Sequence, residues 1–265
     1  MGYRGIKITA AAVLLVSLGL MDPRIASAEP QREESAPVLA TTGWTAAFAR
    51  AAGLSEVGIL APYELPHPAE YELKPSDLRA IAEADLIIYA GYENMVRILK
   101  DVTKESGDKL LQIRTDFRLF TLKESISRIA SVFGTNEHAE KSIKTIAAMY
   151  ENWRNELRKA SLLGAPVLVH LFQKPLAEEL GFEVKGVFGP TPIEARQIVA
   201  LSQESVRLII DNGHNPAGIP LKETLPMIPY ALFINFPAAR DNGSLIDVLN
   251  TNRRALEEAL SSSSE

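Results

Sequence analysis

The sequence predicts an α/β protein with two small lobes, each built on a parallel sheet, joined by a long rigid helix. In both halves of the chain, short apolar strands alternate with polar or helical segments, a pattern typical of parallel sheets covered by helices. Residues 136–163 contain no Gly or Pro and place apolar residues at helical spacing, so one helix of about 40 Å could bridge two lobes. We therefore assign residues 29–136 to a first lobe, 137–163 to the helix and 164–265 to a second lobe.

The N-terminal segment predicts export. Residues 1–28 contain Arg4 and Lys7, an apolar run over 8–21, and Ala-Ser-Ala at 26–28, which together are typical of a cleavable signal peptide. The run is shorter than the roughly 20 residues that a membrane span needs. Because the chain has no cysteine, it has no site for a lipid anchor. We expect a free periplasmic or secreted protein, monomeric, whose net charge of −5 argues against binding nucleic acid.

The elements of the first lobe follow one another at short intervals. The segment "PVLATTGWTAAFARAAG" predicts a buried strand, a Thr/Gly turn and a helix over 45–52. Ser76 is a candidate N-cap for a helix in "KPSDLRAIAEA". Three further strands are expected in "EVGILAP", "DLIIYAG" and "KLLQIR".

The second lobe repeats the alternation. Its expected strands are "PVLVH", "EVKGVFG", "VRLIIDNG" and "YALFINF", each followed by polar or helical sequence. Ligands of such folds gather beyond the C-terminal ends of the strands, so side chains at those ends are the first candidates for a site.

Several segments resemble a known family. "PHPAEYELKPSD", over 66–77, resembles the Pro-His-x-x-Tyr-Glu-x-x-Pro-Ser-Asp signature of the ZnuA/TroA-like (cluster A-I) solute-binding proteins of zinc and manganese ABC transporters, with one extra residue after the His. "ADLIIYAGYE", "VLVHLFQKPLAEELGFEV" and "DVLNTNRRALEEAL" resemble later segments of the same family. The resemblance covers nearly all of the expected mature chain and implies two β/α lobes with a metal held at their interface.

The resemblance also implies ligand positions. His67 matches the first His of the family's site and His170 matches the third ligand. At the second position, "IRTDFRLFTLKES" contains no His. At the fourth, where the family has Asp, the chain has Asn235 and Phe236, with Asp241 a few residues later.

The residues themselves suggest a rebuilt site. His67 lies between two prolines that restrict its loop, and His170 ends an apolar strand, where it could face the cleft or cap the next helix. His214 follows another strand end, with Asp211 three residues before it; the alternative is a surface turn. We expect the imidazole nitrogens of His67, His170 and His214 to lie within about 5 Å of one another, as zinc ligation requires.

The sequence leaves two assignments undecided: the fourth metal ligand and the place of Trp44. Candidates for a fourth ligand are the carboxylates Asp211, Asp241, Glu93 and Glu194. Trp44, at the end of the first strand, could line the cleft or belong to the core.

The functional prediction is a receptor that captures a divalent metal, zinc before manganese, and delivers it to a membrane ABC permease. Imidazole ligands favour zinc, while manganese prefers more oxygen. The metal is cargo, and no catalytic residue or enzymatic activity is expected. One alternative is the same fold with a degenerate metal site that binds another solute or a chelate. A second is an adhesin-type interaction protein.

Overall fold

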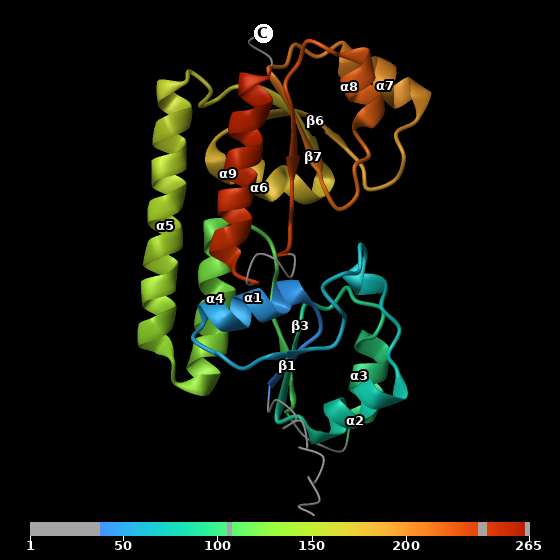
Figure 1. The fold of residues 1–265 in the computed structure, drawn as a ribbon, viewed down its shortest axis with the longest axis vertical. Helices are drawn as coiled ribbons and strands as arrows, with labels where there is room; N and C mark the ends of the chain where they lie inside the picture. Colours follow the sequence, from blue (N-terminus) through green and yellow to red (C-terminus); the bar gives the residue numbers. More distant parts are fainter. Residues whose placement is uncertain (1–37, 105–107, 238–242, 263–265) are drawn as a thin grey trace, which may run out of the picture. The chain divides into compact units, whose positions relative to one another are not determined.

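The computed structural model describes residues 38–104, 108–237 and 243–262, and Figure 1 shows how they fold. They form two four-stranded sheets with strand orders β2-β1-β3-β4 and β6-β5-β7-β8. Every strand pairing is parallel. The predicted fold of two parallel-sheet lobes is therefore confirmed, whereas the expected export signal lies outside the described residues.

The first lobe is built around a buried strand of Leu-Ile-Ile-Tyr, β3, which pairs with β1 and β4. Thr42 caps helix α1, because its hydroxyl accepts the Thr45 N–H. The helices of this lobe are α1 (Gly43–Ala51), α2 (Pro75–Glu83), α3 (Val96–Val102) and α4 (Leu119–Phe133), with the 3-10 turn η1 (Pro68–Glu70). Its strands are β1 (Val38–Ala40), β2 (Gly58–Ile59), β3 (Leu86–Tyr89) and β4 (Leu110–Gln112).

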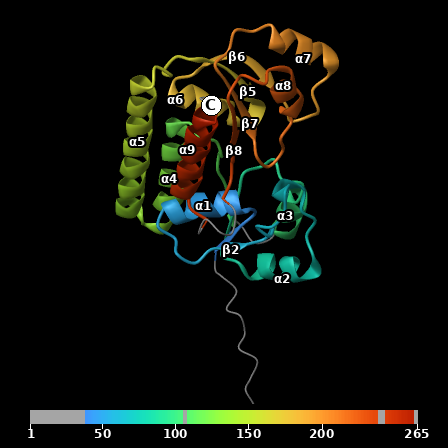
Figure 2. The same ribbon diagram turned by 45° about the horizontal axis from the view of Figure 1, so that its top comes forward.

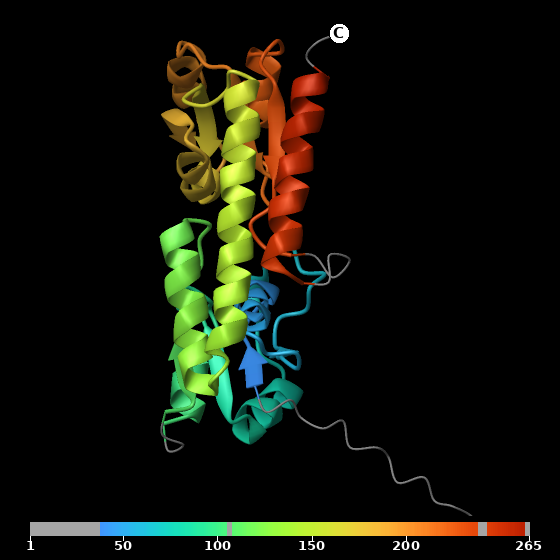
Figure 3. The same ribbon diagram turned by 90° about the vertical axis from the view of Figure 1, so that its left-hand side faces the viewer.

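Helix α5 (Asn136–Lys159) connects the lobes and packs on both of them, against α1 and α4 in the first lobe and α6 in the second. Figures 1 and 3 show it running past both sheets. The helix ends before the expected residue 163. Ser161 adopts a left-handed φ of 56°, and Leu162 turns back into the core at 4% exposure.

The second lobe repeats the first in outline. Its strands are β5 (Pro166–His170), β6 (Glu183–Phe188), β7 (Leu208–Asn212) and β8 (Tyr230–Phe233). Its helices are α6 (Lys174–Leu180), α7 (Ala195–Ser202), α8 (Ile219–Thr224) and α9 (Leu245–Ser261), with the 3-10 turn η2 (Leu171–Gln173). Helix α9 packs on β8 and also reaches α1 of the first lobe.

The core has three parts. One cluster of buried residues runs through both lobes beneath α1, α4, α5, α6 and α9, and each sheet has a smaller cluster on its other face, under α2 and α3 or under α7 and α8. Figure 2 shows α5 and α9 on the side opposite α3 and α8. Since the largest cluster is continuous, the lobes share one core. Within the described residues, no helix is long and apolar enough to cross a membrane.

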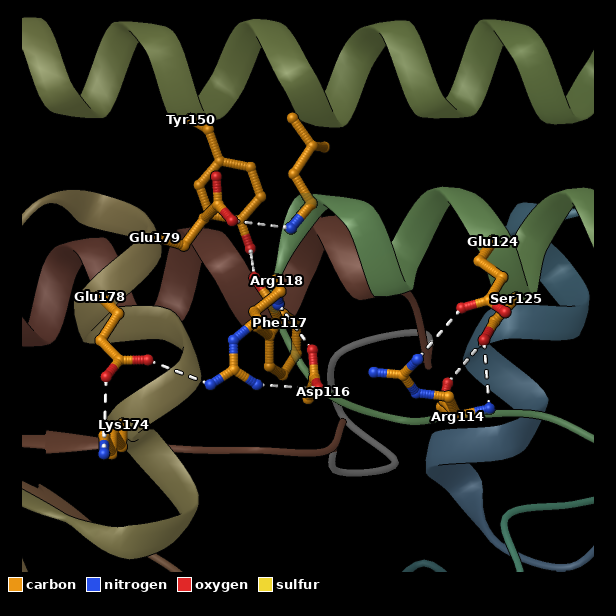
Figure 4. Close-up of polar contacts among 11 residues, drawn as sticks. Arg114, Asp116, Phe117, Arg118, Glu124, Ser125, Tyr150, Lys174, Glu178 and Glu179 are labelled. Carbon is orange, nitrogen blue, oxygen red and sulfur yellow. Dashed lines mark hydrogen bonds and ion pairs between the residues drawn. The ribbon is translucent and has the colours of Figure 1, made fainter.

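Polar contacts connect the two lobes where the loop after β4 enters α4. Arg118 pairs with Glu178 of α6 at 3.0 Å, and the Leu119 N–H donates to the Glu179 carboxylate at 3.0 Å. Arg154 of α5 donates to the Glu179 carbonyl oxygen at 2.8 Å. Figure 4 shows Arg118 reaching Glu178 from the start of α4. These bonds fix the start of α4 to the second lobe.

Candidate metal-binding cleft

A cleft of about 690 Å³ lies between the lobes at the C-terminal ends of their strands. The first lobe contributes Thr42, Trp44, residues 66–70, Tyr92, Thr115 and Asp116. The second contributes Leu171, Phe172, Pro175, Pro190, Thr191, Asn212, His214, Asn215, Asn235 and Phe236. Polar groups beyond the strand ends, among them Asn212 and His214, line this cleft. Trp44, for which the sequence left a place in the cleft or in the core open, has both, because it lines the cleft and also belongs to the buried core.

His67 reaches the cleft from the first lobe. It is exposed and stands just before η1, with Pro68 as the first residue of that turn. The turn is closed by the backbone, since the Glu70 N–H donates to the His67 carbonyl oxygen at 3.0 Å. Neighbouring prolines and this bond restrict the loop, while the imidazole itself stays accessible.

His214 reaches the cleft from the second lobe and is held on several sides. The backbone N–H of His214 donates to Asn212 Oδ1 at 3.2 Å, and the ring Nδ1 lies 2.9 Å from Asn235 Oδ1. The ring stacks on Phe236, with centroids 3.6 Å apart and planes 5° from parallel. Because an amide oxygen only accepts, Nδ1 carries the proton and Nε2 keeps its lone pair. Orienting a ring through its second nitrogen is how proteins prepare an imidazole for a metal.

The two imidazoles are electrostatically coupled. Burial lowers the pKa of His214, the hydrogen bond to Asn235 raises it, and the nearby charge of His67 lowers it again. The net shift is downward from 6.5, so His214 is neutral at pH 7. A neutral ring with a free Nε2 can accept a hydrogen bond or ligate a metal ion.

His170, by contrast, is fully buried and is not among the residues that line the cleft. Its Nδ1 accepts the Phe172 N–H at 3.1 Å, and the ring packs edge-on against Phe188 at 5.8 Å. Nε2 has no partner within the described structure, and a side chain at Gly189 would collide with it. Burial lowers the pKa of His170, although nearby Asp211 raises it. Of the two expected roles, the arrangement corresponds to capping of the following helical turn.

Asp211 is also turned away from the cleft, into the second lobe. Its buried carboxylate accepts the N–H groups of Asn212 at 2.7 Å and Gly218 at 2.6 Å, and the Tyr230 hydroxyl at 2.5 Å. Burial and this hydrogen bond to Asp211 raise the pKa of Tyr230. Asp211 therefore fixes both ends of the loop that carries His214.

The other carboxylates expected as fourth ligands are engaged elsewhere or cannot be placed. Glu93 is buried and accepts from the Thr41 hydroxyl and two backbone N–H groups. Glu194 pairs with Arg196 at 2.8 Å on the surface. Asp241 lies outside the described residues.

The described residues include no group of three His, Cys, Asp or Glu side chains that could hold one ion. The expected convergence of His67, His170 and His214 is therefore not found, because His170 is turned into the core. Sequence reasoning did not single out Asn235 as a partner of His214. A signal was present, since Asn235 stands where the family has its Asp.

Two parallel-sheet lobes, a helix packed on both and a cleft at the strand ends define the class of two-lobed α/β folds with a helical connection. Within that class, residues 38–166 match the model of the family described as ZnuA, zinc-uptake complex component A, periplasmic. No curated protein matches the sequence.

Solved structures share the fold. Zn(II)-bound AdcA from Streptococcus pneumoniae is 17% identical, with a TM-score of 0.58 over 84% of this chain and 57% of that one. The Mn-bound periplasmic metal-binding protein from candidatus liberibacter asiaticus is 17% identical, with a TM-score of 0.58 over 84% and 98%. The solute-binding protein FpvC of P. aeruginosa, in complex with Ni²⁺, is 16% identical, with a TM-score of 0.64 over 84% and 96%.

These comparisons confirm the resemblance to ZnuA/TroA-like metal receptors. The family consists of periplasmic metal-binding receptors, which are not enzymes. The three relatives above hold three different metals, so the shared fold does not select one.

Proposed function

We propose that this protein is an extracytoplasmic solute-binding protein that captures a divalent transition metal, zinc before manganese, for an ABC permease. The observation that carries the proposal is the pair His67 and His214, which line one cleft from opposite lobes. His214 is neutral at pH 7 and oriented by Asn235, so its Nε2 is ready to ligate. Two imidazole donors favour zinc over manganese.

The chemistry of the cleft supports binding and not catalysis. Of the two carboxylates that line it, Glu70 and Asp116, the second accepts the backbone N–H of Arg118 at 2.8 Å and its guanidinium at 3.3 Å, so Asp116 is not a free general base. The expected export signal and the family's periplasmic setting support capture outside the cytoplasm. Delivery to a membrane permease follows from the family's role.

Calorimetric titration of metal-free protein with Zn²⁺ and Mn²⁺ tests the proposal. We expect zinc to bind with Kd below about 10 µM and manganese more weakly. His67→Ala and His214→Ala should each weaken zinc binding at least tenfold. His138→Ala is the matched control, because His138 is exposed in the first turn of α5 and does not line the cleft. Equal zinc affinity in all three variants would refute the role of the cleft imidazoles.

A further inference from the structure

The described residues of the cleft offer a metal ion fewer His, Asp and Glu ligands than the ion needs. Zinc in proteins takes about four ligands, and the imidazoles of His67 and His214 supply two. Among the described residues, no third His, Asp or Glu joins them in a metal-binding group. At least two coordination positions of a captured ion must therefore be filled by something other than these side chains.

The cleft is also much larger than an ion. Its volume of about 690 Å³ falls in the range of pockets that hold small organic molecules, roughly 300–1,000 Å³. A bare ion would leave most of this space to water. The size therefore indicates a cargo with an organic body.

Aromatic side chains form the walls of the cleft. Trp44, Tyr92, Phe172 and Phe236 all line it, and Tyr92 and Phe172 are 54% and 46% exposed. Aromatic rings that stay exposed around a pocket are typical of surfaces covered by a ligand. Trp44 is only 9% exposed, yet its indole N–H has no acceptor within the described part of the chain. The exposed rings of Tyr92 and Phe172 therefore suit a ligand body with a planar aromatic face.

The charge of the cleft limits what that body can be. None of the described residues that line it is a Lys or Arg, whereas Glu70 and Asp116 contribute carboxylates. Among the described residues, an anionic solute would meet no Lys or Arg side chain there. A neutral or positively charged cargo matches this lining.

We propose that the cargo is a divalent metal ion already held by a small planar organic chelator, as a neutral or net cationic complex. His67 and His214 replace two water molecules on the ion, and the chelator lies against the aromatic wall. This inference rests on the proposed function and narrows it, because the receptor would capture a complex and not the bare ion.

Calorimetry with defined probes tests the inference. Nickel stands high in the stability order of divalent ions, so it serves as the metal. Metal-free protein is titrated with Ni²⁺ alone, with the 1:1 Ni²⁺ complex of 1,10-phenanthroline, and with the 1:1 complex of ethylenediamine. Ethylenediamine supplies the same charge and two nitrogen donors without an aromatic face. We expect the phenanthroline complex to bind at least tenfold tighter than the other two, with induced circular dichroism in the phenanthroline band.

Two phenylalanines provide a matched pair of variants. Phe172→Ala removes a ring from the wall and should lower affinity for the phenanthroline complex more than affinity for the bare ion. Phe120→Ala removes a ring that is 68% exposed on α4 outside the cleft and should change neither affinity.

The outcomes separate the two proposals. Binding of bare Ni²⁺ as tight as that of the phenanthroline complex, with the chelator left free, would overturn the chelate and leave the metal receptor standing. Equal loss of preference in both phenylalanine variants would also overturn the chelate. Failure of the protein to bind any probe, and zinc as well, would overturn both.

Discussion

Replacing Asp211 with Asn should destabilise the metal-free protein, because the carboxylate supports the loop that carries His214. The carboxylate accepts three hydrogen bonds, from two backbone N–H groups and the Tyr230 hydroxyl. Each bond to a charged group is worth about 1.5–3 kcal/mol. The amide oxygen of an Asn at position 211 can accept two of these hydrogen bonds, in weaker form. Its NH₂ group would face the third donor, and that hydrogen bond would be lost. We therefore expect a loss of about 2–4 kcal/mol, which lowers Tm by about 5–15 °C in a domain of this size.

Thermal and urea unfolding of metal-free wild type and variant measure the effect. Asp85→Asn is the control, because that carboxylate is exposed and should leave Tm within about 2 °C. If Asp211 has a structural role, Asp211→Asn should change the free energy of zinc binding by less than it changes the free energy of unfolding. An unchanged Tm combined with a tenfold or greater loss of zinc affinity would refute this reasoning and make Asp211 a ligand.

Three further results are expected. Burial lowers the pKa of His170 in the folded protein, so below about pH 6.5 the unfolded chain binds more protons than the folded one. The metal-free protein should therefore lose stability as pH falls from 7 to 5, as measured by urea unfolding. His170→Asn, which keeps a side-chain acceptor, should flatten this dependence. Glu179→Gln should lower the free energy of unfolding in urea by about 1–2 kcal/mol, because the Glu179 carboxylate accepts the first N–H of α4 and pairs with Arg154 of α5. Glu178→Gln should lower it by under about 1 kcal/mol, because its ion pair with Arg118 is more exposed. The reverse order would refute the role given to Glu179 in connecting the lobes. Zinc affinity should fall as pH drops below about 6.5, the ordinary pKa of imidazole, because a metal binds only neutral imidazole. The limiting slope in calorimetry should be about a hundredfold per pH unit for two imidazole ligands, and a thousandfold slope would indicate a third.

Periodicity was sufficient to predict the two sheets and the connecting helix, because both depend on local patterns of apolar residues. Local features also explain the smaller errors. Ser76 was expected to cap α2, but Pro75 occupies the first turn and the helix begins after Lys74, whose N–H donates to Asp77 at 2.7 Å. A proline at the first helical position fixes the start of a helix.

The site was harder to predict because it depends on where side chains turn after each strand ends. His170 and His214 both follow buried strands, yet His170 turns inward to accept a backbone N–H two residues later. His214 is oriented by Asn235, which is 21 residues away along the chain. Asp211 is drawn into the lobe by Tyr230, 19 residues later. Such partners are set by packing of the folded lobe, and spacing in the sequence does not reveal them.

The placement of the two tryptophans gives the protein a built-in optical reporter. Trp44 lines the cleft and stacks on Phe117 with centroids 5.9 Å apart, whereas Trp153 is buried against Phe233 in the shared core. The chain contains no other tryptophan. Cargo entering the cleft changes the surroundings of one indole and leaves the other as a constant background. In a Trp153→Phe variant, the intrinsic fluorescence of Trp44 alone would follow occupancy of the cleft without any attached dye.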